Sequence, residues 1–364
     1  MSSMFDYAEI NGMQLANRFV RSATWEGMAA NDGSITQPLV ETMVNLAKGG
    51  VGLIITSHAY VRSDGQAGSR QIGISEDRFI PGLRQMTDAA HQYESKIVLQ
   101  LAHAGMFAPQ KLTGQIPLTV SDIQSVENRS YHVITEQDIR NITEAYAQGA
   151  IRAQKAGFDG VQIHSAHGYL LSQFLSPAYN HRQDHYGGDI YNRSHALLEI
   201  YQAIRQAVGK NYPVLIKLNC QDFIENGLNL EDSVRVGQLL AEAGIDAIEL
   251  SGGMLTSKKL SPSRPARSDA AEEPYYINEA SEFKNAVSVP LILVGGIRSF
   301  QMAESLVTTG TADYIAMSRP LIREPHLINR WKTGDLNKAE CKSDNRCFRM
   351  GMSGNGISCD MIIE

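Results

Sequence analysis

The chain has 364 residues, of which 43% are hydrophobic and 20% are charged, and this is the composition of a folded globular protein rather than a disordered one. Its 33 Lys and Arg residues against 39 Asp and Glu residues give a formal net charge of -6, which argues against a nucleic-acid partner. No apolar run is long enough to span a membrane and Met1–Glu9 has no signal-peptide pattern, so the sequence predicts a cytoplasmic protein without a membrane partner.

Short β-branched runs alternate with amphipathic stretches along almost the whole chain. In chain order the pattern predicts a strand at Arg18–Arg21, a helix at Gln37–Lys48, a strand at Val51–Ser57, a helix at Arg78–Tyr93, a strand at Lys96–Leu101, a helix at Glu136–Ala156, a strand at Gly160–His164, a helix at Arg193–Val208, a strand at Pro213–Asn219, a helix at Leu230–Ala243, a strand at Ala247–Ser251, a helix at Asn278–Asn285, a strand at Pro290–Val294, a helix at Phe300–Thr308 and a strand at Asp313–Ala316.

The alternation indicates an α/β fold, because the predicted strands are near-continuous apolar runs of the kind that parallel sheets bury on both faces. The length fits either two ordinary domains or one large barrel, and eight units favour a (β/α)8 TIM barrel. A doubly wound open sheet is the competing architecture, although no G-x-G-x-x-G follows a strand. Long excursions at Leu112–His132 and Ser165–Tyr191 are expected over the C-terminal face, where barrel enzymes place their active sites.

Polar side chains at the predicted strand ends are the first candidates for chemistry. Gln100 and His164 each end a strand, and Lys217 interrupts the apolar run Val214–Leu218. A lysine inside a barrel must meet an anion or an electron-rich group, because an unpaired buried charge is costly. A purely structural pair with an Asp or Glu is the alternative, and Lys217 alone does not decide between them.

A denser cluster follows the strand that ends at His164. His167 lies three residues further on, and Tyr169 two residues after that. Two imidazoles can both donate N–H groups to a carbonyl or a developing enolate, and a tyrosine can supply a proton. A zinc site is the other common use of paired histidines, but no third ligand stands at a metal-binding spacing.

Signals for a phosphate site come late in the chain. Gly295 and Gly296 follow the seventh predicted strand, and Met317, Ser318 and Arg319 follow the eighth. Loops at these two positions of a barrel commonly bind phosphate through backbone N–H groups. Glycine allows close approach of the backbone, and arginine can bind a phosphate through two N–H groups.

The run His-Ser-Ala-His-Gly-Tyr-Leu-Leu-Ser-Gln-Phe-Leu-Ser-Pro at His164–Pro177 resembles the signature of the old yellow enzyme family of FMN-dependent oxidoreductases. The downstream residues of that signature are also present, at Asn180, Arg182, Asp184, Tyr186–Gly188 and Asn192–Arg193. Asn17–Val20 is similar to the N-terminal motif of the family. The resemblance extends over about the whole chain, in order and at suitable spacing.

The resemblance implies FMN on the C-terminal face of the barrel. It places the backbone of Ala23, Thr24 and Trp25 along the flavin ring, Ser57 and His58 beside its polar edge, Gln100 at the pyrimidine portion, Lys217 at the N1/O2 side, and Gly295, Gly296, Met317, Ser318 and Arg319 around the phosphate. It also implies that His164 and His167 bind the carbonyl oxygen of the substrate. Tyr169 would then protonate the α-carbon of the alkene. Hydride would pass from NADH or NADPH through the flavin to an activated alkene.

Two features depart from the family pattern. Trp25 stands where a Cys or Thr that tunes the flavin potential is common. The tail carries Cys341, Cys347 and Cys359, similar to the iron–sulfur motif of the 2,4-dienoyl-CoA reductase branch, but Asp344 stands where a second cysteine is expected. Cluster ligation usually needs four cysteines, so the sequence argues against a bound iron–sulfur cluster or other metal.

We therefore expect residues 1–335 to form the FMN-binding barrel and residues 336–364 to form a tail with a degenerate cysteine motif. The expected partner is a small-molecule substrate, and the sequence leaves a homo-oligomer open. Two other functions stay open at this point. One is a flavin-dependent amine dehydrogenase or demethylase, and the other is a barrel lyase or isomerase without flavin that uses Lys217 as a Schiff base or general base.

Overall fold

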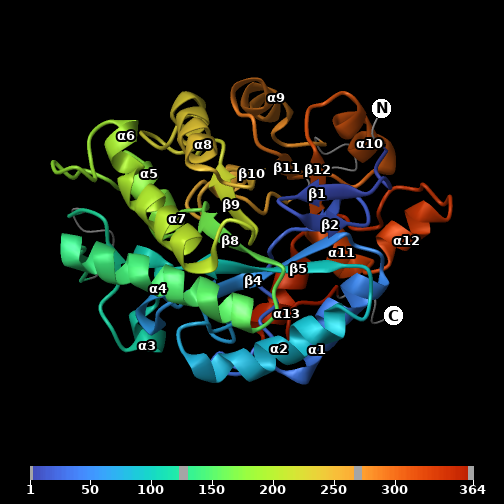
Figure 1. Cartoon of the computed structure of the whole chain (residues 1–364), viewed down its shortest axis with the longest axis horizontal. Coiled ribbons are helices and arrows are strands. Elements are labelled where there is room, and N and C mark those ends of the chain that lie inside the picture. The colour runs from blue at the N-terminus through green and yellow to red at the C-terminus, as the bar shows by residue number, and fades with distance from the viewer. Residues whose placement is uncertain (1–2, 123–129, 266–272, 360–364) are drawn as a thin grey trace.

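The structure is a computed structural model that describes residues 3–122, 130–265 and 273–359. Eight parallel strands close into a barrel, in which the last strand pairs with the first through Ile315 and Phe19 (Figure 1). All eight predicted strands are confirmed, and the open-sheet alternative is wrong. Around the barrel the strands are β3 (Phe19–Arg21), β4 (Leu53–Tyr60), β5 (Lys96–Ala102), β8 (Gly160–Ser165), β9 (Val214–Asn219), β10 (Ala247–Ser251), β11 (Leu291–Val294) and β12 (Tyr314–Met317).

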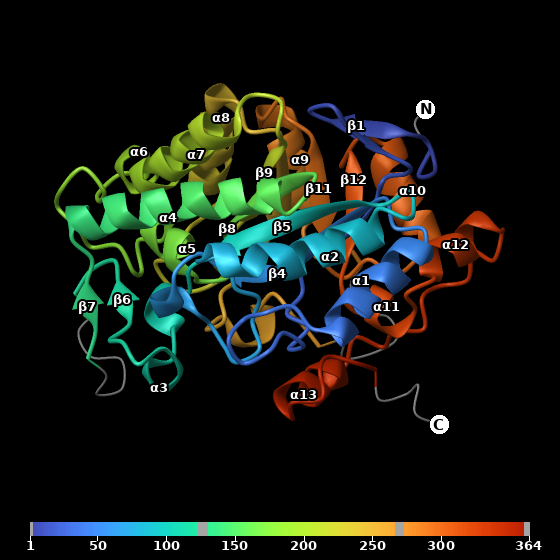
Figure 2. The same ribbon diagram turned by 60° about the horizontal axis from the view of Figure 1, so that its bottom comes forward.

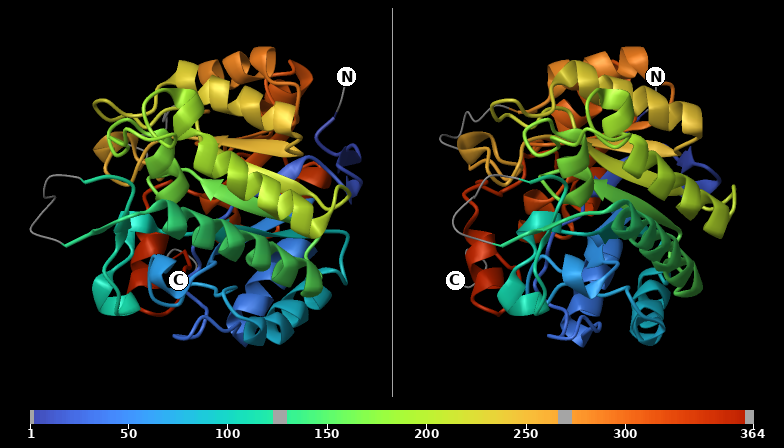
Figure 3. Two further views of the ribbon diagram at one scale, coloured as in Figure 1. Left: turned by 60° about the vertical axis from the view of Figure 1, so that its left-hand side comes forward. Right: turned by 90° about the vertical axis from the view of Figure 1, so that its left-hand side faces the viewer.

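Helices pack around the outside, and α4 and α7 lie side by side across it (Figures 1 and 3). Each strand is followed by at least one of them, as right-handed β-α-β units require. The helix predicted at Arg193–Val208 is divided in two at Ser194. The main helices are α1 (Gln37–Lys48), α2 (Ile80–Ala90), α4 (Glu136–Lys155), α7 (His195–Val208), α8 (Leu230–Ala243), α9 (Ile277–Ala286), α10 (Phe300–Thr308) and α12 (Leu327–Lys332).

The interior of the barrel is apolar towards the N-terminal ends of the strands and polar at their C-terminal ends. Val20, Leu53, Val98 and Leu215 belong to the buried cluster of the interior. A second, larger cluster lies between the strands and the helices, which explains why the strands are apolar on both faces. Among the described residues, no helix is long and apolar enough to cross a membrane.

A hairpin before the barrel was not predicted. It pairs β1 (Ala8–Ile10) with β2 (Met13–Leu15), and its apolar side chains pack into the interior cluster. The turn is Asn11–Gly12, with φ of 43° and 77°, and Asn-Gly is the common two-residue hairpin turn because both positions need positive φ. The alternation of polar and apolar residues around this dipeptide was the signal that could have revealed the hairpin.

The two long excursions contain short elements that the sequence patterns did not reveal. Residues 123–129 of the first excursion lie outside the described part of the chain. The described elements in the excursions and loops are η1 (Ser63–Gly65), η2 (Asp77–Phe79), η3 (Gly105–Phe107), α3 (Gln110–Thr113), β6 (Leu118–Thr119), β7 (His132–Val133), α5 (Leu170–Leu175), α6 (Ile190–Arg193) and η4 (Lys258–Leu260).

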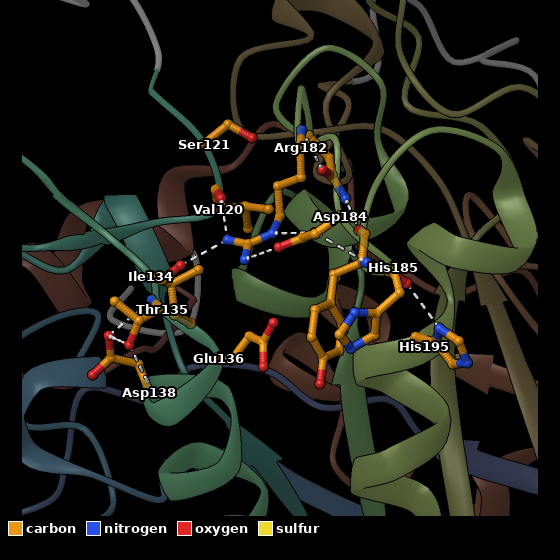
Figure 4. A network of polar contacts seen from close by, with 12 residues as sticks. Val120, Ser121, Ile134, Thr135, Glu136, Asp138, Arg182, Asp184, His185 and His195 are labelled. Carbon is orange, nitrogen blue, oxygen red and sulfur yellow. Dashed lines mark hydrogen bonds and ion pairs between the residues drawn. The ribbon is translucent and has the colours of Figure 1, made fainter.

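Arg182 joins the two excursions to each other (Figure 4). Its Nη1 donates to the carbonyl oxygens of Val120, at 3.1 Å, and Ile134, at 2.6 Å. Its Nε and Nη2 donate to the carboxylate of Asp184, at 3.0 and 2.6 Å. A planar guanidinium with five donors can satisfy several oxygens at once, so one side chain fixes both loops above the strand ends.

The chain after β12 first packs outside the barrel, and its tail then reaches the cavity at the strand ends through Asn345 and Phe348. The short helix α11 (Arg319–Arg323) and α12 come first, and Trp331 packs against Phe19 and Phe300 at ring distances of 5.5 and 5.8 Å. The tail then reaches α13 (Arg346–Met352), far from the N-terminal hairpin in Figure 2. A backbone bond from the Ile357 N–H to the Glu26 carbonyl, at 2.7 Å, attaches the tail to the loop after β3.

Candidate active site

A cavity of about 390 Å³ at the carboxyl ends of the strands gathers most of the predicted site residues. Leu255 and Ser261–Ser263, from the loop after β10, form part of its wall, and Asn345 and Phe348 of the tail form another part. The predicted residues that line it are Ala23, Thr24, Trp25, His58, Gln100, His164, His167, Tyr169, Lys217 and Ser318.

Strand register explains why residues far apart in sequence meet here. His164 on β8 lies opposite Lys217 on β9, and His58 on β4 lies opposite Gln100 on β5. The pairing of β4 with β5 is irregular between Ile55 and His58, as in a β-bulge, and bulges redirect side chains. Ser57 is buried and does not line the cavity. Its predicted place beside the flavin edge therefore stays a prediction.

His164, His167 and Tyr169 converge on one side of the cavity. The ring of His164 lies 4.8 Å from that of Tyr169 and 5.3 Å from that of His167. The chain turns sharply between them, with φ of 64° at His167 and 91° at Gly168, and a side chain at residue 168 would be strained there. The Nε2 of His167 lies 2.8 Å from the Ser251 hydroxyl.

The Nδ1 of His164 is buried and has no hydrogen-bond partner among the described residues. An orphaned polar atom of this kind is costly unless a ligand or water satisfies it. Of the side chains that converge here, His164 therefore has a free polar atom for a ligand.

His58 joins this group in a way that the sequence did not reveal. Its Nε2 lies 3.1 Å from the Tyr169 hydroxyl. Burial lowers the pKa of His58 to about 4, with a contribution from the nearby Lys217. Burial also lowers the pKa values of His164 and His167 and raises that of Tyr169. At neutral pH the three imidazoles are therefore uncharged and the tyrosine keeps its proton.

These shifts make the stability of the apoprotein sensitive to acid. The pKa of His58 is about 4 in the folded protein against an ordinary 6.5, so between these values the unfolded chain binds the proton and the folded chain does not. Stability is therefore full above about pH 6.5 and falls as the pH drops towards 4, by about 3 kcal/mol for His58. Urea unfolding of the apoprotein at pH 7 and pH 5 measures the loss.

Glu26 acts in the opposite direction, because burial raises its pKa to about 7. Its protonated form adds to the stability of the folded protein at low pH, and this addition is lost as the pH rises through about 7. The pKa values of all three histidines are lowered, so each of them loses stability in acid, and we expect a net loss there. The control is His58→Gln, which should lose less stability between the two pH values. An unfolding midpoint that is equal at both pH values in the original protein would contradict this account.

Lys217 lies at the base of the cavity in a buried polar network. Its Nζ lies 3.1 Å from Oε1 of Glu249 and donates to the Ser22 hydroxyl at 2.8 Å. Gln162 connects Glu249 to Gln100. The sequence reading missed Ser22, Gln162 and Glu249. A signal existed, since Gln162 and Glu249 each interrupt an otherwise apolar barrel strand.

A second, smaller cavity of about 60 Å³ adjoins the first and shares Pro262, Ser263 and Ser318 with it. The predicted phosphate residues Gly295, Gly296, Met317, Ser318 and Arg319 line this cavity. A Cβ at Gly295 would come within 2.9 Å of the Tyr276 ring, so the wall requires glycine. The structure therefore brings the predicted phosphate residues together, beside the predicted ring site.

The sequence suggested that Arg319 binds a phosphate through two N–H groups. In the structure both Nη groups of its guanidinium donate to protein atoms. Its Nη1 donates to the Arg264 carbonyl at 2.9 Å, the Ser343 carbonyl at 3.1 Å and Asn345 Oδ1 at 2.7 Å. Its Nη2 donates to the Tyr275 hydroxyl at 3.2 Å. The fold thus uses both Nη groups to hold the tail against the loop after β10, while Arg319 still lines the smaller cavity.

Trp25 is fixed between the first loop and the tail. A Cβ at Gly27 or at Gly351 would come within 2.9 Å of its indole ring, so both glycines pack closely on it. The indole Nε1 is buried without a hydrogen-bond partner among the described residues. The bulky Trp25 side chain, which departs from the family pattern, is therefore packed against the tail, where Gly351 leaves room for it.

The cysteines of the tail gather at a third, very small cavity. Cys341, Asp344, Cys347 and Cys359 all line it, and all four cysteines of the chain are free thiols. Nevertheless, within the described residues no three His, Cys, Asp or Glu side chains converge closely enough to hold a metal ion. The expectation of no bound cluster stays a prediction.

The barrel, the polar cavity at its C-terminal face and the adjoining glycine-walled cavity define a flavin-binding oxidoreductase barrel. The chain belongs to the NADH:flavin oxidoreductase / NADH oxidase family, whose sequence profile matches residues 3–338. The resemblance to old yellow enzymes is thereby confirmed, and FMN is the cofactor of the family. The family match does not favour the alternative of a lyase or isomerase without flavin, and Lys217 Nζ lies 3.1 Å from Oε1 of Glu249.

Known proteins resemble this chain in sequence and in fold. The NADH oxidase of Thermoanaerobacter brockii is 34% identical over 349 residues, which cover 94% of this chain and 53% of that protein. An NADPH dehydrogenase of Geobacillus sp. is 32% identical over 330 residues, covering 89% of this chain and 92% of that protein. The structure of an old yellow enzyme homologue from Zymomonas mobilis matches with a TM-score of 0.80 and 25% identity, covering 94% of this chain and 96% of that one. The chain thus spans about half the length of the first of these relatives.

The residues present fit FMN. The larger cavity offers a cation at Lys217 and buried polar atoms without partners at Trp25 and His164, and the smaller one offers backbone at Gly295 and Gly296. A cation, orphaned polar groups and a glycine-walled phosphate cradle match the polar edge and phosphate of a flavin nucleotide.

Proposed function

We propose that the chain reduces activated alkenes, such as α,β-unsaturated carbonyl compounds, at the expense of NADH or NADPH. The observation that carries this proposal is the convergence of His164, His167 and Tyr169 in the cavity that also holds Lys217. FMN, when bound, would supply the hydride transfer from the nicotinamide to the β-carbon of the alkene. The two-electron balance is complete when the α-carbon receives one proton.

The side chains of the cavity would supply that proton and hold the substrate. His164 and His167 are neutral, so each can donate one N–H to the carbonyl oxygen without carrying a charge into the site. These hydrogen bonds strengthen as negative charge moves onto that oxygen. Tyr169, which keeps its proton, would protonate the α-carbon, and His58 would hold the tyrosine hydroxyl in place.

The other roles follow the positions of the residues. Lys217 and Gln100 would meet the pyrimidine portion of FMN, Ala23–Trp25 and His58 its ring, and the glycines with Met317, Ser318 and Arg319 its phosphate. We further propose a barrel at residues 1–335 and a tail at residues 336–364 that closes the cavity. A small-molecule substrate and a cytoplasmic location, without nucleic-acid or membrane partners, agree with the acidic charge and the polar cavity.

The visible spectrum of the purified protein tests this proposal directly. We expect a flavin spectrum that bleaches on anaerobic addition of NADH or NADPH and returns on addition of cyclohexenone. A protein that carries FMN but, once reduced, is not reoxidised by any enone would contradict the proposed substrate class. Reduction by an amine without nicotinamide would instead support the dehydrogenase alternative.

Phe348 provides a test of the role of the tail. Its side chain lines the cavity from α13, so Phe348→Ala should weaken the binding of a small cyclic enone. Loss of an apolar contact of this size is expected to change kcat/KM about tenfold, mainly through KM. The control is Met352→Ala on the same helix, since Met352 is 74% exposed. Equal kinetics in both variants would contradict a tail that forms the substrate wall.

A further inference from the structure

A buried carboxylate lies directly behind the wall of the cavity. Glu249 on β10 is 0% exposed and pairs in register with Lys217 on β9. It does not line the cavity, whereas Lys217 does. Burying a carboxylate in a barrel interior is expensive unless it is paired and hydrogen-bonded, so each oxygen of Glu249 needs partners.

One oxygen of Glu249 fixes the ammonium group of Lys217. Oε1 lies 3.1 Å from Lys217 Nζ and accepts a hydrogen bond from the Ser22 hydroxyl at 2.6 Å. The same hydroxyl accepts from Lys217 Nζ at 2.8 Å, which closes a three-membered ring of contacts. The cation at the base of the cavity is therefore held in place and is largely balanced by a negative charge one strand away.

The other oxygen begins a relay of amides. Gln162 Nε2 donates to Glu249 Oε2 at 2.7 Å, and Gln162 Oε1 accepts from Gln100 Nε2 at 2.7 Å. An ionised carboxylate can only accept hydrogen bonds, so the amide of Gln162 must turn its nitrogen towards Glu249 and its oxygen towards Gln100. Gln100 must then turn its nitrogen towards Gln162, which leaves its carbonyl oxygen as the end of the relay.

From these contacts we infer that Glu249 is a positioning residue for the pyrimidine portion of FMN. Through Lys217 it reduces the net positive charge offered to the N1/O2 side, and through Gln162 it sets which end of the Gln100 amide can accept a hydrogen bond from the ligand. The inference rests on the proposed placement of FMN against Lys217 and Gln100. A neutral residue of the same shape at position 249 would leave the lysine charge uncompensated and would allow the amide relay to reverse.

The midpoint potential of bound FMN and its dissociation constant test the inference. In Glu249→Gln the uncompensated Lys217 should favour reduced FMN, and we expect the reduction equilibrium to shift about tenfold, which is about 30 mV for a two-electron couple. The dissociation constant of FMN should change as well. In this variant the carboxylate no longer fixes which end of the Gln100 amide faces the ligand. Glu249→Asp keeps the charge and should stay closer to the original potential than Glu249→Gln does.

The comparison variant is Lys217→Met, which should lower the potential. A lowered potential in Lys217→Met with an unchanged or lowered one in Glu249→Gln would overturn the inference while leaving the FMN placement intact. Unchanged potentials in both variants would overturn the inference and the placement together. If the potentials shift as expected but no enone is reduced, the proposed activity fails and the role of Glu249 stands.

A double variant covers the case in which Glu249→Gln does not fold. Lys217→Met together with Glu249→Gln replaces a buried ion pair by neutral side chains, a change that folds tolerate better than removal of one partner. Both the original pair and the double variant have no net charge, so their midpoint potentials should be similar. A potential in the double variant as low as that of Lys217→Met would show that Glu249 does not balance the lysine and would overturn the inference.

Discussion

Replacement of Tyr169 by phenylalanine is expected to slow enone reduction by about 10²- to 10⁴-fold, the usual contribution of a positioned proton donor. The phenyl ring keeps the packing against His164 and His58 but lacks the hydroxyl. Reduction of bound FMN by NAD(P)H needs no proton from this residue and should proceed at the original rate. Stopped-flow measurement of the two half-reactions separates the effects.

The matched control for this experiment is Tyr179→Phe. Tyr179 lies in the same excursion, and its hydroxyl contacts the exposed Thr256 at 3.2 Å rather than the cavity. Its loss should leave both half-reactions unchanged. If Tyr169→Phe reduces enones as fast as the control variant does, Tyr169 is not the proton donor and a water molecule or another side chain must be.

Replacement of His164 by alanine is expected to lower the rate of enone reduction by about 10²- to 10³-fold, as removal of a preorganised donor to a developing oxyanion does. His167 cannot replace it, because a neutral imidazole has one N–H, and in the proposed arrangement that of His167 already serves the same oxygen. His164→Asn should recover part of the rate, since an amide also donates an N–H from a similar position. Steady-state kcat and KM with cyclohexenone measure both effects.

His185→Ala provides the control for a histidine in the same excursion. The His185 side chain is exposed and packs against Tyr186, and it does not line the cavity, so its loss should leave kcat unchanged. A rate for His164→Ala within about twofold of this control would contradict the role of His164 as an oxyanion donor, because a lost donor should cost far more.

The barrel was readable from the sequence because its signals are local. Apolar runs such as Leu291–Val294 are buried on both sides, and the glycines at Gly157 and Gly244 end the preceding helices through positive φ. The Asn11–Gly12 hairpin carried an equally local signal and was overlooked. The short helices of the excursions and of the tail were not readable, because helices of four to seven residues are stabilised by tertiary contacts rather than by periodicity.

The candidate site also has a part that could be predicted from the sequence and a part that could not. Residues at strand ends, such as His164 and Lys217, could be proposed because the carboxyl ends of barrel strands meet on one face. The surroundings of Ser57 and Arg319 could not be foreseen, and their roles beside the flavin and its phosphate stay predictions. An irregular pairing in β4 precedes His58 and Ser57 lies outside the cavity lining, while the tail engages Nη1 of Arg319 and Tyr275 of the loop after β10 engages Nη2. Both effects depend on partners that no local pattern encodes.

The sequence by itself determined the class of fold, the face that carries the site and the central histidine and tyrosine cluster, since periodicity, strand ends and spacing are properties of neighbouring residues. Only the tertiary structure decided that the tail helix forms a wall of the cavity through Phe348 and that His58 meets Tyr169. It alone decided that Glu249 stands opposite Lys217, because the register between strands brings together side chains that lie far apart in the chain.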